Sequence, residues 1–279
     1  MPQNKTELTD LELSDLIEVR ARRDLFAAAP ADFGCAVMEV PGTGATLMRV
    51  PAMPTPAMNR VVGLPGDSAL TDRTLAWIQR AFRDGGVDDF WLHAWALPVD
   101  ATLKAGYEAR GWRPDAQQAW AKFLCDLERP LPEQTPTPAL QVRRAGADEA
   151  NLSGDIVCRG FGMAPQMAPW MGAVVGRPGW QVYFACDANG TPVASAALFI
   201  DGPRAWLGIS ATLPEARQKG SQQTLLAVRM AAAKAAGCSV AGIETEVSAE
   251  GEPGHSLNNI RRAGFREIGQ RFNYRCLAN

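Results

Sequence analysis

Twelve residues carry the strongest structural signal in this chain: Thr212-Leu213-Pro214-Glu215-Ala216-Arg217-Gln218-Lys219-Gly220-Ser221-Gln222-Gln223. They leave a predicted strand, turn at a proline, pass through Arg-x-x-Gly and enter a predicted helix rich in Ala and Leu. Such a turn directs several backbone N–H groups outward at the positive end of the helix, which favours a phosphate or pyrophosphate. Gly220 has no Cβ, so an anion can approach its backbone closely. By itself, Arg-x-x-Gly is also compatible with an ordinary helix start.

A second segment follows about 40 residues later, with helix and strand predicted in between. It reads Ser256-Leu-Asn-Asn259-Ile-Arg-Arg262-Ala-Gly264-Phe265 and predicts a short helix that closes at Gly-Phe. The first segment is neither a Walker loop nor a dinucleotide-binding fingerprint, because GxxxxGK[ST] and GxGxxG are both absent.

Together, the two segments resemble the two signatures of the GNAT N-acetyltransferase superfamily, in the same order. The first signature has the form V-x-P-x-x-R-x-x-G-x-G/A, which Pro214, Arg217 and Gly220 match. Gln222 stands where Gly or Ala is usual. The resemblance covers residues 140–279, and it implies that acetyl-CoA binds there as a co-substrate.

The resemblance also implies a role for each matched position. The backbone at Thr212 and Leu213 would bond the pantetheine arm, and Asn259, followed by Arg262, would approach the cofactor from the other side. The pyrophosphate would lie against the turn and the start of the helix, at Arg217, Gln218, Lys219, Gly220, Ser221 and Gln222. No metal is implied.

Two glutamates are the candidate catalytic residues. Glu244 and Glu246 are two residues apart on a predicted strand and therefore face the same side. Glu244 stands where some superfamily members carry a general base. An equal alternative is that the two glutamates only form a polar face of this strand that is exposed to solvent. Many members carry a Tyr as general acid at the position of Ile260, so a Tyr donor is not supported here. The family implies direct attack of an amine on acetyl-CoA in a ternary complex.

Residues 140–279 predict the element order β-α-α-β-β-β-α-β-α-β, which is also the order of the superfamily. Asn-Gly at 189–190 is expected to supply the positive φ angles of a hairpin turn. Strands are predicted at 140–144, 180–186, 193–200, 205–213, 240–247 and 267–277. Helices are predicted at 148–158, 221–236 and 256–263, and the second helix of the order, which follows 148–158, is given no bounds.

The first half repeats this pattern in part. Predicted helix, Gly, strand, helix, Arg-Gly-Trp112 and strand recur there at similar spacing. Strands are predicted at 36–40, 45–50, 61–64, 90–97 and 120–125, and helices at 11–26, 71–83 and 102–110. Tyr107 lies in a segment like the second signature, but the residues 63–73 before the main helix have no Arg-x-x-Gly-x-Gly/Ala. The first half is therefore interpreted as a degenerate copy.

We accordingly expect an α/β (α+β) protein of two GNAT-like domains, each with a mixed, mostly antiparallel central sheet flanked by helices. Four prolines in residues 130–138 favour an extended linker, so the domains are placed at 1–128 and 140–279 with the linker at 129–139.

The composition excludes several other classes. With 28 Lys plus Arg against 30 Asp plus Glu, the chain shows no cationic excess of the kind that holds nucleic acid. Its six cysteines contain no CxxC pair, which suits a reducing compartment and leaves little to build a zinc site. Neither a signal peptide nor an apolar run long enough for a membrane is present, so we expect a cytoplasmic protein.

The sequence therefore predicts an acetyltransferase that acts on an amine of a small molecule or peptide. A non-catalytic acyl-CoA-binding or regulatory module is the alternative, favoured by Ile260 and by the degenerate first half. A related aminoacyl or longer-chain acyl transferase is a third possibility. The acceptor and any association into a homodimer stay open.

Overall fold

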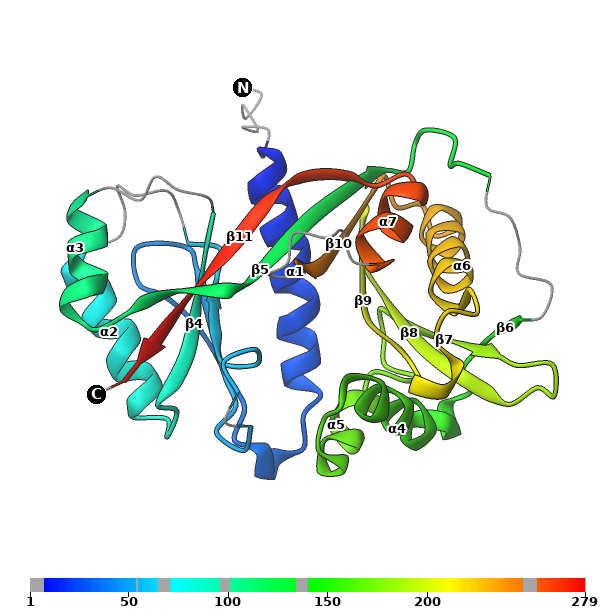
Figure 1. Ribbon diagram of the computed structural model, residues 1–279, viewed down its shortest axis with the longest axis horizontal. Coiled ribbons are helices and arrows are strands. Elements are labelled where there is room, and N and C mark those ends of the chain that lie inside the picture. Colours follow the sequence, from blue (N-terminus) through cyan, green and yellow to red (C-terminus); the bar gives the residue numbers. More distant parts are fainter. Residues whose placement is uncertain are drawn as a thin grey trace, which may run out of the picture.

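In the computed structural model the chain folds around one eleven-stranded sheet (Figure 1). The structure describes residues 8–53, 55–64, 71–95, 101–133, 140–247 and 255–278. Most of the predicted linker (134–139), the end of the predicted strand at 96–97 and residues 65–70 before the first half's main helix lie outside these ranges.

The second half has the predicted elements with small shifts at their ends. Its strands are β6 (Gln141–Arg144), β7 (Trp180–Cys186), β8 (Pro192–Asp201), β9 (Arg204–Thr212), β10 (Val240–Val247) and β11 (Arg266–Leu277). Its helices are α4 (Ala150–Phe161), α5 (Ala168–Gly172), α6 (Ser221–Ala235) and α7 (His255–Arg262), with short 3-10 turns at Ala147–Glu149, Pro165–Met167 and Pro214–Ala216.

The first half repeats this order without an equivalent of β6 and with one helix in place of α4 and α5. Its helices are α1 (Asp10–Ala27), α2 (Asp72–Arg83) and α3 (Ala101–Ala109), with a 3-10 turn at Ala31–Phe33. Its strands are β1 (Ala36–Glu39), β2 (Thr46–Arg49), β3 (Arg60–Val62), β4 (Asp89–Trp95) and β5 (Arg113–Asp126). The fold class is confirmed: the sheet is mostly antiparallel, and only the pairs β3–β4 and β9–β10 are parallel among the described strands.

The two halves exchange their last strands. The sheet order is β1-β2-β3-β4-β11-β5-β10-β9-β8-β7-β6, so β5 of the first half pairs with β10 of the second half, and β11 of the second half pairs with β4 of the first. The exchanged strands β5 and β11 also pair with each other, at the middle of the sheet. The sheet is therefore continuous across both halves, which the sequence repeat did not show.

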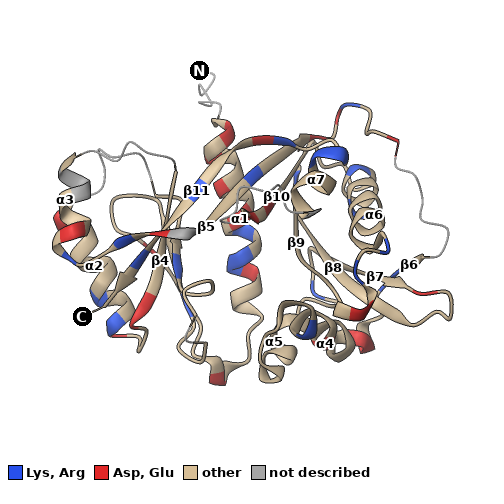
Figure 2. Cartoon of the chain, viewed as in Figure 1, with Lys and Arg blue, Asp and Glu red and all other residues tan. Residues whose placement is uncertain are grey.

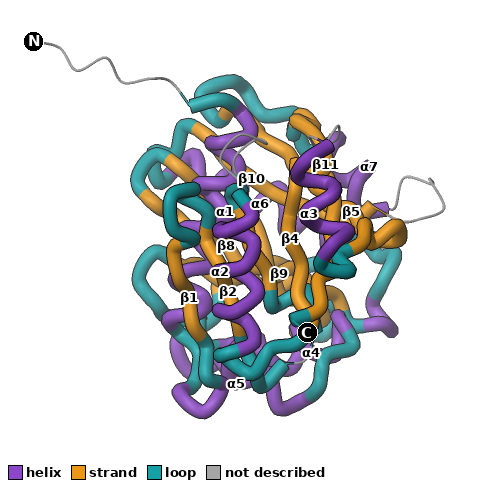
Figure 3. The backbone as a smooth tube through the Cα atoms, turned by 90° about the vertical axis from the view of Figure 1, so that its left-hand side faces the viewer, coloured by secondary structure: helices purple, strands orange, loops and turns teal. Residues whose placement is uncertain are grey.

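Alternating side chains divide the helices between the two faces of the sheet. On β5, Leu124 packs with α1 and α5 in one core cluster, whereas Phe123 packs with α6 and α7 in another. Helices α2 and α3 cover Phe90 and Leu92 of β4 on the face away from α1, and in Figure 3 they lie at the end of the molecule nearest the viewer. Helix α1 thus shares its face with α4 and α5.

Local sequence explains where α1 begins and what it buries. Thr9 and Glu12 form a capping box, in which each side chain satisfies a backbone N–H at the helix start. Ile17, Ala21 and Leu25 recur every four residues and are buried against the sheet. Acidic and basic residues lie side by side along the same helix in Figure 2.

All six cysteines are free thiols, and five of them are buried. No helix within the described ranges is both long and apolar enough to cross a membrane.

Candidate functional site

An opening between two strands defines the candidate site. Strands β9 and β10 run parallel, but their pairing ends at Leu207 and Ile243. Beyond that point β9 continues along β8 as far as Thr212, and β10 continues along β5 as far as Val247. The two strands therefore part at the level of Gly208 and Glu244, and beyond that point β9 has no strand partner on its β10 side among the described residues.

A bulge in β9 lies at the same level. The register between β8 and β9 shifts between Ser195 and Ala197, and Ile209 takes a left-handed φ of 46°. The Trp206 ring lies over Gly208 and fills the space that a Cβ at this position would occupy. Arg22 also lies against this ring, with its guanidinium carbon 5.6 Å from the ring centre.

The turn at residues 217–222 connects β9 to the start of α6. Gln218 and Gly220 both have left-handed φ angles, of 62° and 84°. Gly220 is the N-cap of α6, and no side chain caps this helix end. Within the described residues, the N–H groups of Gly220, Ser221 and Gln222 donate to no protein acceptor. Free N–H groups at a helix N-terminus form an anion site.

The two cationic side chains of this turn, Arg217 and Lys219, are held by hydrogen bonds to backbone carbonyls. Arg217 is exposed and donates to the carbonyl of Gly160 at 2.8 Å, and exposed Lys219 donates to the carbonyl of Glu215 at 3.2 Å. The Ser221 hydroxyl is buried and has no hydrogen-bond partner among the described residues. Both cationic side chains are therefore held by backbone carbonyls, one of α4 and one of the turn before α6.

Helices α6 and α7 are joined by three side chains. The Gln222 amide donates to the Ser256 hydroxyl at 3.0 Å, and it accepts a bond from the Asn259 amide at 2.8 Å. Arg262 lies exposed near the end of α7. The structure therefore brings the first and second predicted segments into direct contact. Thr212 is half-buried and Leu213 is buried, at the end of β9.

The corresponding helix start in the first half is built differently. Thr71 caps α2, and its hydroxyl accepts the N–H of Thr74 at 3.2 Å. Tyr107 is 1% exposed and packs 4.8 Å from Tyr274, ring centre to ring centre, in the core beneath α2 and α3. Tyr107 is thus a core residue of the first half, in a different core cluster from Ile260.

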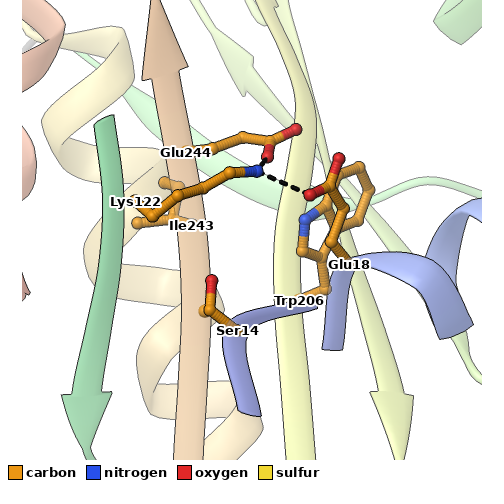
Figure 4. A pocket seen from close by; sticks show the side chains of 7 residues that line it. Ser14, Glu18, Lys122, Trp206, Ile243 and Glu244 are labelled. Atoms are coloured by element: carbon orange, nitrogen blue, oxygen red, sulfur yellow. Dashed lines mark hydrogen bonds and ion pairs between the residues drawn. The ribbon is translucent and has the colours of Figure 1, made fainter. Parts of the chain in front are cut away.

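Glu244 belongs to a closed ring of alternating charge with Arg22, Glu18 and Lys122. Figure 4 shows the part of this ring in which Lys122 lies between Glu18 and Glu244. Arg22 donates to Glu244 at 2.5 Å and to Glu18 at 2.6 Å. Lys122 bonds Glu18 at 2.5 Å and also bonds Glu244. Three of the four members come from the first half, through α1 and β5. Since the Glu244 side chain is only 7% exposed, the expected alternative of a solvated polar face is wrong at this position.

Burial and mutual attraction shift the pKa values in and around this charge ring. Burial favours the neutral form of Glu18, but Lys122, Arg22 and Arg60 outweigh it and lower the Glu18 pKa well below its usual value. Burial lowers the pKa of Lys122 to about 8, against the opposing pull of Glu18. The pKa of neighbouring His93 also falls well below its usual value, mainly through burial. Glu18 is therefore a carboxylate at neutral pH and His93 is neutral.

Little space remains beside the charge ring. The hollow there leaves essentially no room even for a water molecule, whereas typical ligand pockets have volumes of roughly 300 Å³ or more. Its lining residues are Ser14, Glu18, Lys122, Trp206, Gly242, Ile243 and Glu244. Glu246, two residues further along β10, is exposed.

The aromatic and Met side chains after α4 hold α5 against α1. Trp170 is fully buried, donates its indole N–H to the Leu25 carbonyl at 2.8 Å and meets Phe26 edge to face. Met167 and Met171 are buried in the same cluster. Phe161, by contrast, is 57% exposed. Most of this group therefore forms core packing between the halves.

Sequence reasoning missed three members of the charge ring. Glu18 and Arg22 are four residues apart on a predicted helix, the usual spacing of an intrahelical ion pair. Lys122 stands alone among apolar residues in Trp120-Ala-Lys-Phe-Leu-Cys125. A lone charge in a buried strand requires a partner of opposite charge. The isolated Lys122 was therefore the sequence signal for a buried ion pair, but only the tertiary structure identifies its partners.

The chain matches no protein-family model and no curated protein. Solved structures do resemble it. A GCN5-related N-acetyltransferase from Sphaerobacter thermophilus has a TM-score of 0.63 at 14% identity, with 87% of this chain and 82% of that one covered. A GCN5-related N-acetyltransferase from Kribbella flavida has a TM-score of 0.62 at 15% identity, with 97% and 96% covered.

A tandem GNAT protein from the clavulanic acid biosynthesis pathway is also similar, with a TM-score of 0.57 at 15% identity over 96% of this chain and 94% of that one. At such identities the similarity concerns the fold, and it extends over both halves. The chain therefore has the fold of the GCN5-related N-acetyltransferases, in a tandem arrangement.

Proposed function

We propose that this chain transfers an acetyl group from acetyl-CoA to an amine of a small molecule or peptide. The observation that carries the proposal is the uncapped start of α6 with its free N–H groups, which follows β9 in the chain after β9 has parted from β10. An anionic pyrophosphate fits the first feature. An extended arm with amide groups fits the second, because unpaired strand edges bind such groups by backbone hydrogen bonds.

The amine would attack the thioester carbonyl directly, so that the C–N bond forms, the C–S bond breaks and CoA leaves as a thiolate that takes a proton from water. The described residues of the site offer no obvious nucleophile for an acyl-enzyme. Glu246 is the exposed carboxylate near the opening and is suited to accept the proton of the amine. Glu244 faces the same side, but Arg22 and Lys122 already occupy its two oxygens.

Calorimetric titration with acetyl-CoA tests the binding step. Wild-type protein should bind, and Gly220→Asp should bind at least about tenfold more weakly, because it places a side chain and a negative charge among the free N–H groups. Lys219→Glu should also weaken the binding of acetyl-CoA. A correctly folded wild-type protein that shows no binding at millimolar acetyl-CoA would contradict the proposal.

A second candidate function is a non-catalytic acyl-CoA-binding module. Two observations favour it: both oxygens of Glu244 are engaged by cations, and Ile260 is buried where many GNAT enzymes carry a Tyr. Release of free CoA thiol in the presence of a panel of amines separates the candidates. Steady turnover supports the enzyme, whereas tight binding without turnover supports the module.

If turnover is found, the two glutamates can be compared directly. A general base contributes roughly 100-fold or more to the rate, so Glu246→Gln should lower kcat by about that factor between pH 6 and 9. Glu244→Gln should mainly lower stability, through loss of its two cation contacts. An unchanged rate for Glu246→Gln would remove it as the base, and a large loss of kcat in folded Glu244→Gln would transfer that role to Glu244.

A further inference from the structure

Gln222 departs from the Gly or Ala of the acetyl-CoA signature, and its side chain has a defined place in the structure. It extends from the first turn of α6 to α7 and uses both ends of its amide. The Nε2 group donates to Ser256 Oγ at 3.0 Å, and Oε1 accepts from Asn259 Nδ2 at 2.8 Å. All three side chains are half-buried, so each bond is partly shielded from water.

These bonds fix the orientation of the Asn259 amide. A primary amide presents a donor on one side and an acceptor on the other. Because Gln222 Oε1 takes the Nδ2 donor, the Asn259 oxygen is left to face elsewhere. The described residues provide no hydrogen bond to that oxygen. An acceptor held in this way matches the secondary amide N–H groups of a pantetheine arm.

We infer that Gln222 is a positioning residue, which holds Asn259 with its carbonyl oxygen ready for the pantetheine arm of the cofactor. The inference rests on the proposed binding of acetyl-CoA. The backbone N–H of Gln222 serves the pyrophosphate, while its side chain serves the other end of the ligand through Asn259. The larger residue thus adds a contact that Gly or Ala could not make.

The opposing role for Gln222 is obstruction, because a side chain that spans α6 and α7 can block a ligand that passes between them. The two roles predict opposite changes in CoA affinity when the Gln222 side chain is removed. If Gln222 positions Asn259, its removal weakens binding of CoA. If Gln222 obstructs the ligand, its removal strengthens that binding.

The test compares two ligands, CoA and adenosine 3′,5′-bisphosphate, which is the nucleotide part of CoA and lacks both the pantetheine arm and the second phosphate of the pyrophosphate. Calorimetry would measure the affinity of each ligand for wild type, for Gln222→Ala and for Gln223→Ala. Gln223 is the matched control, since it is the adjacent half-buried glutamine of the same helix turn. We expect Gln222→Ala to lose about tenfold in CoA affinity and less than about twofold in affinity for the bisphosphate.

Asn259→Ala completes a double-mutant cycle. If Gln222 acts through Asn259, Gln222→Ala should cost no further CoA affinity in the Asn259→Ala background. Thermal unfolding of each variant verifies that it is folded before its binding is compared.

Four results would overturn the inference. Gln222→Ala could weaken both ligands equally, leave the affinity for CoA unchanged, or raise it, or it could cost further CoA affinity in the Asn259→Ala background. Failure of the proposed function gives a different result, since folded wild-type protein would then bind neither CoA nor the bisphosphate.

Discussion

At position 244, a glutamate on β10 meets Arg22 and Lys122 from the first half of the chain, and Glu18 completes the charge ring. The ring is electrically balanced, but each member depends on the others, because water is largely excluded from all four. Removing one partner of a buried ion pair leaves an uncompensated charge, which is strongly destabilising. The stability of the protein should therefore respond strongly to a single substitution in this charge ring.

Glu18→Gln should destabilise the protein by about 3 to 5 kcal/mol at neutral pH, since Arg22, Lys122 and Arg60 would lose their common carboxylate. The pKa of Glu18 is lowered in the folded state. Its stabilisation is therefore complete above about pH 4.5 and is lost as the pH falls through the folded-state pKa. The difference between wild type and Glu18→Gln should accordingly shrink in acid.

Urea unfolding at several pH values between 7 and 3 measures this difference. Glu39→Gln is the control, because Glu39 is exposed on β1 and should change stability by less than about 0.5 kcal/mol. A Glu18→Gln protein as stable as wild type at pH 7 would show that the charge ring does not hold α1 in place.

At the scale of elements, β9 owes its shape to a large residue lying against a small one. Trp206 is 5% exposed and packs with Trp180 and Arg22, while Gly208 leaves the space that its ring occupies. The strand leaves β10 after Leu207, and the bulge at Ile209 follows at once. The tryptophan and glycine therefore position the opening at which we propose that the cofactor arm binds.

Gly208→Ala should displace the Trp206 ring and destabilise the protein by roughly 1 to 3 kcal/mol, as overpacking of a core does. Thermal unfolding should show a lower Tm, and the tryptophan fluorescence spectrum should shift as the ring moves. Gly190→Ala in the β7–β8 hairpin is a useful comparison: a Cβ there would meet no atom within 4 Å, so any effect comes from the φ of 80° alone. An unchanged Tm for Gly208→Ala would contradict this account of β9.

The hairpin also shows a limit of local prediction. The sequence predicts positive φ angles for Asn-Gly at 189–190, but only Gly190 has one. The Asp187 carboxylate instead accepts the N–H groups of Asn189 and Thr191, at 2.9 and 3.0 Å, and so stabilises the turn. The strands on both sides of the turn nevertheless lie close to their predicted ranges.

For the whole molecule, the exchanged strands determine how the halves depend on each other. Eight residue pairs join β10 to β5 and seven join β11 to β4, and every one of them connects the first half to the second. Helix α1 adds further contacts, through the charge ring and through Trp170. The connection between the halves thus does not depend on the peptide chain between residues 133 and 140.

A protease site inserted at 134–139 tests this dependence. After cleavage the two fragments should stay together on gel filtration, because the exchanged strands and α1 still hold them. They should separate only in denaturant. Cleaved fragments that elute apart under native conditions would contradict the strand exchange.

The sequence by itself determined the local structure and the position of the proposed cofactor site. Its periodicity and its turn residues place nearly all helices and strands, including the turn that holds Arg217 and Gly220 and the short helix that holds Asn259, because these are properties of neighbouring residues. Only the tertiary structure decided with which half the last strand of each half pairs and which side chains surround Glu244. Glu18, Lys122 and Glu244 are more than 100 residues apart in the chain, so their meeting depends on the strand exchange, which no local pattern encodes.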